Sequence, residues 1–357
     1  MHRPQVYPAL PRAWRDADTV QWGLPGQPGV ALTGLTPGDV AVLDALDGTH
    51  DVPALLQVAD AHGLPGARVH QLLRLLDQAG VLVDAPDRPS TRADRADLSQ
   101  LTGPDPGPDP GRRGVVDRRG ADSWALAYGT TDDGLGLLLA RGRRRVAIEG
   151  PDPARPGHAG PDPLVAGIAS TVTAAGIGTV TAPDAEATGP AASAPGAPDL
   201  VVLVRDDVVD VRRGDALVDD GQDHLPVVRS GDRVTVGPLV TPGRGPCLRC
   251  LDLHRRDRDP AWPQLAAQLS RTPSGRPGRA AARGEPACTA VAAGLAALQV
   301  LVHLDGQVRP VSHGCTLEVL LPQGLVERRR WSAHPGCGCV LLATGSPDGP
   351  ALRERRA

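Results

Sequence analysis

Two closely spaced pairs of cysteines constrain the fold of this chain more than any other feature of its sequence. Cys247 and Cys250 stand in the motif PCLRC, and Cys337 and Cys339 stand far downstream in HPGCGC. Thiolates two or three residues apart can bind one tetrahedral Zn²⁺, and a second pair completes a four-thiolate site with no position left for a substrate. The pattern predicts a structural zinc ion that ties two distant segments together. Four buried thiols are the alternative, and His334 could replace one of the sulfur ligands.

The remaining cysteines and the start of the chain indicate where the protein works. Cys288 and Cys315 lie in apolar surroundings and are expected to be small buried residues. The opening segment MHRPQVYPALPRAW has no apolar signal stretch, and no uninterrupted apolar run approaches the roughly 20 residues that span a bilayer. We therefore expect a cytoplasmic protein without a membrane partner, in which cysteines serve as thiols or metal ligands rather than disulfides.

Three amino acids are missing from the sequence, and their absence excludes several chemistries. The chain contains no lysine, no asparagine and no phenylalanine. A P-loop, a protein kinase and a Schiff-base enzyme each need a lysine amine, so none of these is available in its usual form. The formal net charge of −3 gives no basic field, which argues against nucleic acid as a partner.

Residues 1–85 form a first compositional block. Alternating apolar and polar residues between Asp18 and Leu32 predict short strands, and cap signals delimit three helices at about 37–47, 52–61 and 65–79. A closing strand, VLVD, follows the third helix. Strands and three short helices predict a small winged-helix module.

A second block follows a segment rich in Pro, Asp and Gly at residues 86–120, which we interpret as a linker. In residues 121–345 the strands RRRVAIEG, GIGTVTAP and PDLVVLV surround a helix at about 163–175, and the hairpin LPVVRSGDRVTVGPLV comes after them. This order predicts an α/β domain with a doubly wound, Rossmann-like sheet. Residues 346–357 are expected to be a disordered tail.

A nucleotide site in this second domain would have to use the loop EGPDPARPGHAG. Gly150 opens the loop, and Asp206, at the end of PDLVVLV, could bind magnesium at the same edge of the sheet. Backbone N–H groups and close glycine backbones are what such a loop offers to phosphates. Pro151, Pro153 and Pro156 each remove a donor, so we expect a degenerate site and no ATP.

The segment from His224 to Leu269, together with GEPACTAVAAGLAALQVL and WSAHPGCGC, resembles the ThiF-type, ubiquitin-activating-enzyme-like proteins of thiazole/oxazole-modified peptide biosynthesis. The winged-helix block is similar to PqqD, a module that binds the leader of a precursor peptide. The resemblance implies zinc ligation by the four cysteines. This sequence differs from active members of the family, which carry a GxGxxG loop with Arg, Asn and Lys around ATP.

The resemblance implies a non-catalytic scaffold that presents a leader-bearing precursor to a YcaO-type cyclodehydratase, with a homodimer as one oligomeric option. The leader would add as a strand beside residues 18–33 and contact the third helix. The expected leader-binding residues are Val20, Trp22, Arg68, Leu72 and Arg74. Two other functions stay open: an active ATP-dependent adenylyltransferase and a winged-helix DNA-binding regulator.

Overall fold

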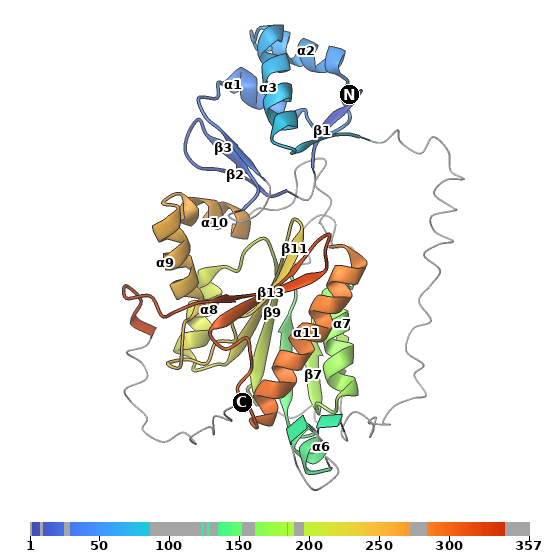
Figure 1. Ribbon diagram of the computed structural model, residues 1–357, viewed down its shortest axis with the longest axis vertical. Helices are drawn as coiled ribbons and strands as arrows, with labels where there is room; N and C mark the ends of the chain where they lie inside the picture. Colours follow the sequence, from blue (N-terminus) through green and yellow to red (C-terminus); the bar gives the residue numbers. More distant parts are fainter. Residues whose placement is uncertain are drawn as a thin grey trace, which may run out of the picture. The chain divides into compact units, whose positions relative to one another are not determined.

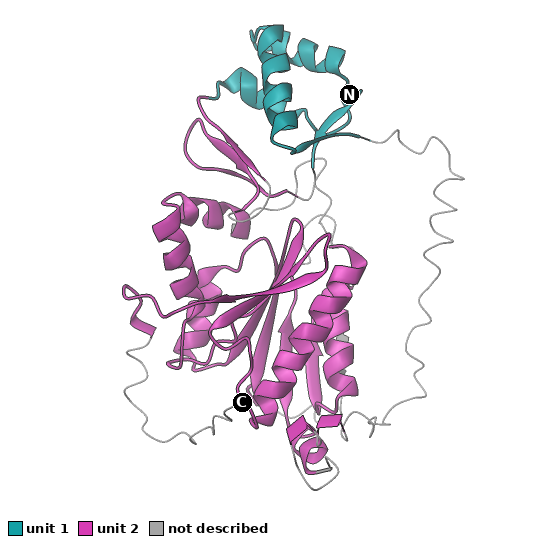
Figure 2. Cartoon of the chain, viewed as in Figure 1, with its two compact units in different colours: residues 1–7, 35–116 teal, residues 8–34, 117–357 magenta. Residues whose placement is uncertain are grey.

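The computed structural model describes residues 2–7, 10–24, 29–85, 123–124, 127–128, 135–151, 161–183, 185–188, 196–271 and 284–339. The predicted linker, the predicted tail and residues 152–160 of the proline-rich loop lie outside these ranges. The chain divides into two compact units, shown in Figure 2. The smaller unit comprises Met1–Tyr7 and Leu35–Val116, and the larger unit comprises Pro8–Gly34 and Asp117–Ala357.

Three helices and a two-stranded ribbon form the described part of the smaller unit. The helices are α1 (Pro37–Asp44), α2 (Val52–Ala61) and α3 (Gly66–Gln78), and β1 (Pro4–Val6) pairs antiparallel with β5 (Leu82–Asp84). Thr36 and Asp39 form a capping box at the start of α1, and the Asp51 side chain caps α2. The sequence predicted all three helices, because caps and apolar spacing mark each of them.

A three-stranded antiparallel sheet at the start of the chain belongs to the larger unit. Its order is β2 (Arg12–Trp14), β3 (Val20–Trp22) and β4 (Val30–Leu32). β2 packs on α10 (Trp262–Arg271), where Ala13 shares a buried cluster with Trp262. Arg15 forms an ion pair with Asp259 at 2.6 Å. The predicted winged-helix block is therefore divided: β2, β3 and β4 belong to the larger unit, while the three helices and the closing strand β5 belong to the smaller unit.

An eight-stranded mixed sheet is the centre of the larger unit (Figure 1). Its order is β13-β12-β11-β10-β9-β6-β7-β8, in which β7, β6, β9 and β10 are parallel and the other neighbours are antiparallel. The bounds are β6 Arg145–Glu149, β7 Thr179–Ala182, β8 Ala185–Thr188, β9 Leu200–Asp206, β10 His224–Ser230, β11 Arg233–Val236, β12 Cys315–Leu320 and β13 Leu325–Arg330.

Helices cover both faces of this sheet. α7 (Pro163–Ala174) and α11 (Pro286–Asp305) share the main hydrophobic cluster with one face, and α8 (Val211–Asp219) and α9 (Leu248–Arg258) pack on the other face. A further helix, α6, covers Leu135–Arg141. The mixed α/β fold agrees with the prediction.

α11 is the one described helix long and apolar enough to cross a membrane. Ten of its residues are buried in the protein, so it is a core helix here.

Candidate functional site

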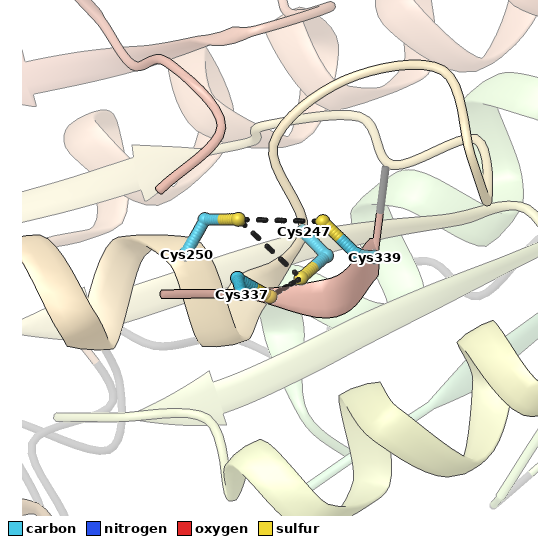
Figure 3. Close-up of side chains that lie close together, drawn as sticks. All are labelled: Cys247, Cys250, Cys337 and Cys339. Atoms are coloured by element: carbon cyan, nitrogen blue, oxygen red, sulfur yellow. Dashed lines mark hydrogen bonds between the residues drawn. The ribbon is translucent and has the colours of Figure 1, made fainter. Parts of the chain in front are cut away.

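The four cysteines of the two predicted pairs lie together at the N-terminal end of α9. Cys247 is the N-cap of α9 and Cys250 lies in its first turn, while Cys337 and Cys339 come from the segment after β13. Figure 3 shows the four side chains turned toward one another. A helix N-terminus favours negative charge, so this position suits thiolates.

The distances between the sulfur atoms fit a single metal ion. The Cys247 Sγ lies 3.8 Å from that of Cys250 and 3.6 Å from that of Cys337, and the Sγ atoms of Cys250 and Cys339 are 3.4 Å apart. All four sulfurs lie within 4.8 Å of one another. A tetrahedral ion with bonds of about 2.3 Å needs sulfurs about 3.8 Å apart. The cluster can therefore hold a metal ion and is compatible with zinc.

Three thiols of the cluster, those of Cys247, Cys250 and Cys339, have perturbed pKa values. A hydrogen bond from Cys247 is the main reason why the pKa of Cys250 falls to about 4, and the backbone N–H of His334 helps. The same bond raises the pKa of Cys247, and burial raises that of Cys339 to about 12. One thiolate thus forms readily, and a bound cation would stabilise the others.

His334 does not act as a ligand in this arrangement. Its Nε2 is 2.8 Å from a carboxylate oxygen of Asp257, and its Nδ1 accepts a hydrogen bond from the backbone N–H of Gly336. Both ring nitrogens are therefore used, and the four-thiolate set is the one that the structure assembles.

A buried ion triad lies at the N-terminus of α7, the helix that follows the proline-rich loop. Asp162 is the N-cap of α7 and accepts hydrogen bonds from the backbone N–H groups of Leu164 and Val165. Arg229, whose side chain is 4% exposed, forms ion pairs with Asp162 at 2.7 Å and Asp206 at 2.9 Å. Burial acts to lower the pKa of Arg229, but the attraction of the two carboxylates is stronger. The pKa of Arg229 is therefore raised above its usual value.

Both predicted nucleotide-binding residues, Asp206 and Gly150, contact other parts of the protein. Asp206 is bound to Arg229, so its carboxylate is already engaged. Gly150 lies against Pro183, and a Cβ atom there would stand 3.1 Å from the proline ring. The carboxylate of Asp162 occupies the end of α7 that a phosphate would otherwise approach.

A large pocket with a volume of about 650 Å³ lies on the α9 side of the sheet, entirely within the larger unit. Its floor comes from β10 to β13, one wall comes from α9 and Trp262, and the opposite wall comes from β3 and β4. The charged residues that line it have both signs: Arg15, Arg233, Arg255, Arg258, Arg329, Asp207, Asp252, Asp259 and Glu318.

Trp331 is the centre of the basic side of this pocket. The guanidinium carbons of Arg255, Arg258 and Arg329 lie 5.7, 5.5 and 5.9 Å from its ring centroid. Such cation–aromatic contacts hold the arginines in place beside the cavity. No sequence motif marks Trp331 as a site residue, because nothing in the sequence brings the end of β13 to α9.

The expected leader-binding residues are divided between the two units. Val20 and Trp22 lie on β3 in the larger unit and are 0% and 3% exposed, although Trp22 lines the pocket. In the smaller unit Leu72 is 1% exposed, Arg68 is bonded to Asp39, and Arg74 is exposed. Val20 and Leu72 thus belong to hydrophobic cores.

Among the described residues, no strand pairs with the outer side of β4, which is therefore the open edge of the small sheet. Bonds from Gly23 to Pro11 and from Arg15 to Thr19 show which backbone groups join β2 to β3. By alternation, Val20 and Trp22 bond to β4, and the backbone N–H and C=O of Ala31 face away from β3. At the opposite edge, the carboxamide of Gln268 bonds the backbone N–H and C=O of Trp14. Ala31 is exposed and lines the pocket.

Comparisons with known proteins leave the family of this chain unassigned. No family model matches the chain, and no curated protein matches it.

Solved structures that resemble the chain include a heterocyclase in complex with substrate and cofactor (TM-score 0.44, 16% identity) and the heterocyclase TruD (0.40, 18%). Each covers 95% of this chain, but this chain spans only 40% and 43% of their lengths. E. coli MccB with a MccA peptide covers 95% of this chain, and 99% of MccB is covered, with a TM-score of 0.41 and 12% identity. These likenesses are distant, so the function of this chain has to be argued from its own residues.

Proposed function

We propose that this protein is a scaffold that binds the leader of a precursor peptide and presents the precursor to a YcaO-type cyclodehydratase, without adenylating it. The observation that carries the proposal is the pocket of about 650 Å³ that is bordered by the open edge of β4. An extended peptide can add to such an edge through backbone hydrogen bonds, while a neighbouring pocket selects its side chains.

The lining of the pocket suits a peptide better than a small uniform ligand. Arginines and carboxylates both line it, and Trp22, Trp262 and Trp331 supply aromatic surface. Acidic leader side chains would meet the arginines around Trp331, and basic ones would meet Asp252 or Glu318. Burial raises the pKa of Asp252, while Arg255 and the indole N–H of Trp262 act in the opposite direction.

The lack of adenylation is supported by the ion triad of Asp162, Arg229 and Asp206. An internal carboxylate at the end of α7 would repel a phosphate, and the chain has no lysine to offset that repulsion. The competing function, an ATP-dependent adenylyltransferase, would require this triad to open.

The metal in this proposal is zinc with a structural role. Four thiolates fill a tetrahedral coordination sphere, so no position remains for a substrate or an activated water. The ion would join α9, which forms one wall of the pocket, to the segment that follows Trp331. Zinc would thus keep two walls of the peptide site together.

The role of the smaller unit also belongs to the proposal. We assign residues 1–85 to a PqqD-like module in which Arg74 on α3 is an exposed leader contact and Arg68, Val20 and Leu72 support the contact surfaces. Because β2 depends on Gln268 and Asp259, the full chain rather than residues 1–85 alone is the correct object for binding measurements.

The proposal is tested by fluorescence anisotropy with the labelled leader of a candidate precursor peptide, sought among the neighbouring reading frames. Ala31→Pro removes the backbone donor of the open edge and leaves the bonds between β3 and β4 in place, so leader binding should weaken at least tenfold. Ala31→Val is the matched control, because it keeps the donor and favours a strand.

Equal leader affinity in the wild type and Ala31→Pro, with both variants folded, would show that the leader does not add to β4. ATP-dependent pyrophosphate exchange in the presence of precursor would favour the adenylyltransferase instead.

A further inference from the structure

β13 ends the eight-stranded sheet on one side, and no described strand pairs with its outer edge. All the residues of this strand, Leu325–Arg330, are exposed. Leu325 is 55% exposed and Val326 is 48% exposed, and three arginines follow Glu327. A long exposed strand edge is a template for pairing with another chain, and proteins normally cover it, shorten it or charge it. Here the edge is neither covered nor short, so its charges decide what can pair with it.

The hydrogen bonds of the β12–β13 pair show which backbone groups of β13 remain unused. The two strands are antiparallel, and just beyond β13 the backbone N–H of Trp331 donates to the carbonyl of Gly314. Backbone groups alternate between the two sides of a strand, so the odd-numbered residues of β13 also bond to β12. The N–H and C=O groups of Val326, Arg328 and Arg330 therefore point outward, away from β12.

The side chains of these three residues share one face of the sheet. Val326 lies opposite Val319 and Arg328 lies opposite Leu317, and both β12 residues belong to the hydrophobic cluster that α11 shares. Side chains directly opposite each other in an antiparallel pair point to the same face. Val326, Arg328 and, by alternation, Arg330 are thus on the α11 side of the sheet.

The two faces of β13 differ in charge. On the pocket side, Arg329 forms an ion pair with Glu318 at 3.7 Å, and Glu327 shares that face by alternation. On the α11 side, neither Arg328 nor Arg330 forms an ion pair within the part of the chain that the structure describes. Two exposed cations without carboxylate partners therefore lie in line with the unused backbone groups.

We propose that β13 binds an extended acidic segment of a partner protein, which adds to the sheet as a further antiparallel strand. Two acidic side chains of the segment lie opposite Arg330 and Arg328, and an apolar side chain lies opposite Val326. Side chains on one face of a strand are two residues apart, so the segment reads acid, any residue, acid, any residue, apolar residue. Backbone hydrogen bonds attach the segment, and the two acids select it.

A second copy of this chain is a poor occupant of the edge. When two β13 strands pair antiparallel with their outward residues in full overlap, Arg328 stands opposite Arg328 of the second copy. Like charges directly opposite each other in a sheet are destabilising. The arginines thus reject the same edge of another copy and favour an acidic strand.

The site goes beyond the proposed leader scaffold and does not depend on it. Leader binding is assigned to β4 and the pocket, and Arg329 is the one residue of β13 that lines the pocket. Val326, Arg328 and Arg330 face the other side of the sheet, so a partner strand at β13 leaves the pocket side free.

Hydrogen exchange of the full chain, read by mass spectrometry, tests the proposal with a synthetic peptide as the probe. The peptide acetyl-Thr-Glu-Thr-Glu-Thr-Val-Thr-amide carries the expected pattern. At about 1 mM it should slow the exchange of the outward β13 amides about threefold, as expected when the ligand concentration is about twice the Kd. The same peptide with Gln in place of both Glu residues is the matched control and should leave exchange unchanged.

Variants of the chain separate the backbone contribution from the charges. Val326→Pro removes an outward donor and leaves the bonds to β12 in place, so protection should be lost. Val326→Thr keeps the donor and should retain protection. Arg328→Glu should abolish protection, whereas Arg212→Glu makes the same charge change at a residue of α8 that is 66% exposed and should not. A peptide with Lys in place of both Glu residues should protect the double variant Arg328→Glu, Arg330→Glu.

Three results would overturn the proposal: no slowing of exchange in β13 by the acidic peptide, equal slowing by the Gln peptide, or slowing that survives in both Val326→Pro and Arg328→Glu. Thermal unfolding of each variant verifies that it is folded. Leader binding is measured separately with Ala31→Pro, so failure at β13 leaves the scaffold proposal standing.

Discussion

Replacing Cys247 by serine should release the metal ion and destabilise the larger unit. A metal ion bound by both Cys250 and Cys339 would cross-link two segments of the chain that lie 89 positions apart. In the chain-entropy model, a cross-link over a loop of this length contributes about 4.5 kcal/mol to stability. Each kcal/mol corresponds to about 2–4 °C for a domain of this size, so the melting temperature should fall by about 9–18 °C.

The assay combines metal analysis with calorimetry on protein prepared without chelators. The wild type should contain one zinc per chain, and Cys247→Ser should contain much less. Cys288→Ser is the matched control: Cys288 is equally buried but lies outside the cluster, where its thiol makes one weak contact with the carbonyl of Val319. It should retain zinc. If the wild type holds no metal, or if Cys247→Ser has the same melting temperature as the wild type, the cluster does not stabilise the fold through a metal ion.

Three other predictions follow from buried polar groups. Titration calorimetry with magnesium-ATP should show no binding tighter than about 1 mM, and a micromolar Kd would refute the blocked nucleotide position. Arg229→Met should cost about 3–5 kcal/mol in urea unfolding, because it leaves Asp162 and Asp206 without their cation; an unchanged midpoint would contradict the triad. His224 is fully buried, and burial lowers its pKa, so the unfolded chain binds a proton first and stability should fall as pH drops below about 6.5. His224→Leu should flatten that fall in thermal melts between pH 7.5 and 5.5, and equal slopes would refute the reasoning.

The parts of the fold that the sequence predicted are those that local patterns determine. The strand PDLVVLV is a continuous apolar run, and it became β9 in the middle of the sheet, where both faces are covered. The two cysteine pairs predicted that their four thiols lie together, because spacings of two and three residues are typical of metal ligands.

The parts that could not be predicted depend on contacts between distant residues. α9 is half charged and has no apolar period, yet its Leu248 and Cys250 are buried in one cluster with Val201 and Leu203 of the sheet. All six residues of β13 are exposed, so no burial pattern marks this strand. The attachment of β2 to α10 depends on Gln268, which no local signal connects with Trp14.

The attachment of β2 to the late segment has a consequence for synthesis on the ribosome. Arg15 leaves the ribosome 244 positions before its ion-pair partner Asp259. At about 5–20 residues per second, β2–β4 must wait on the order of 10–50 s before α10 exists to pack against them. During that interval Trp14 and Trp22 lack the contacts with α10, while α1 to α3 already have the contacts with one another and with β5 that the structure describes. Biogenesis therefore cannot proceed strictly from the first residue onward, and the nascent strands are the part of this chain for which a chaperone has the longest opportunity to bind.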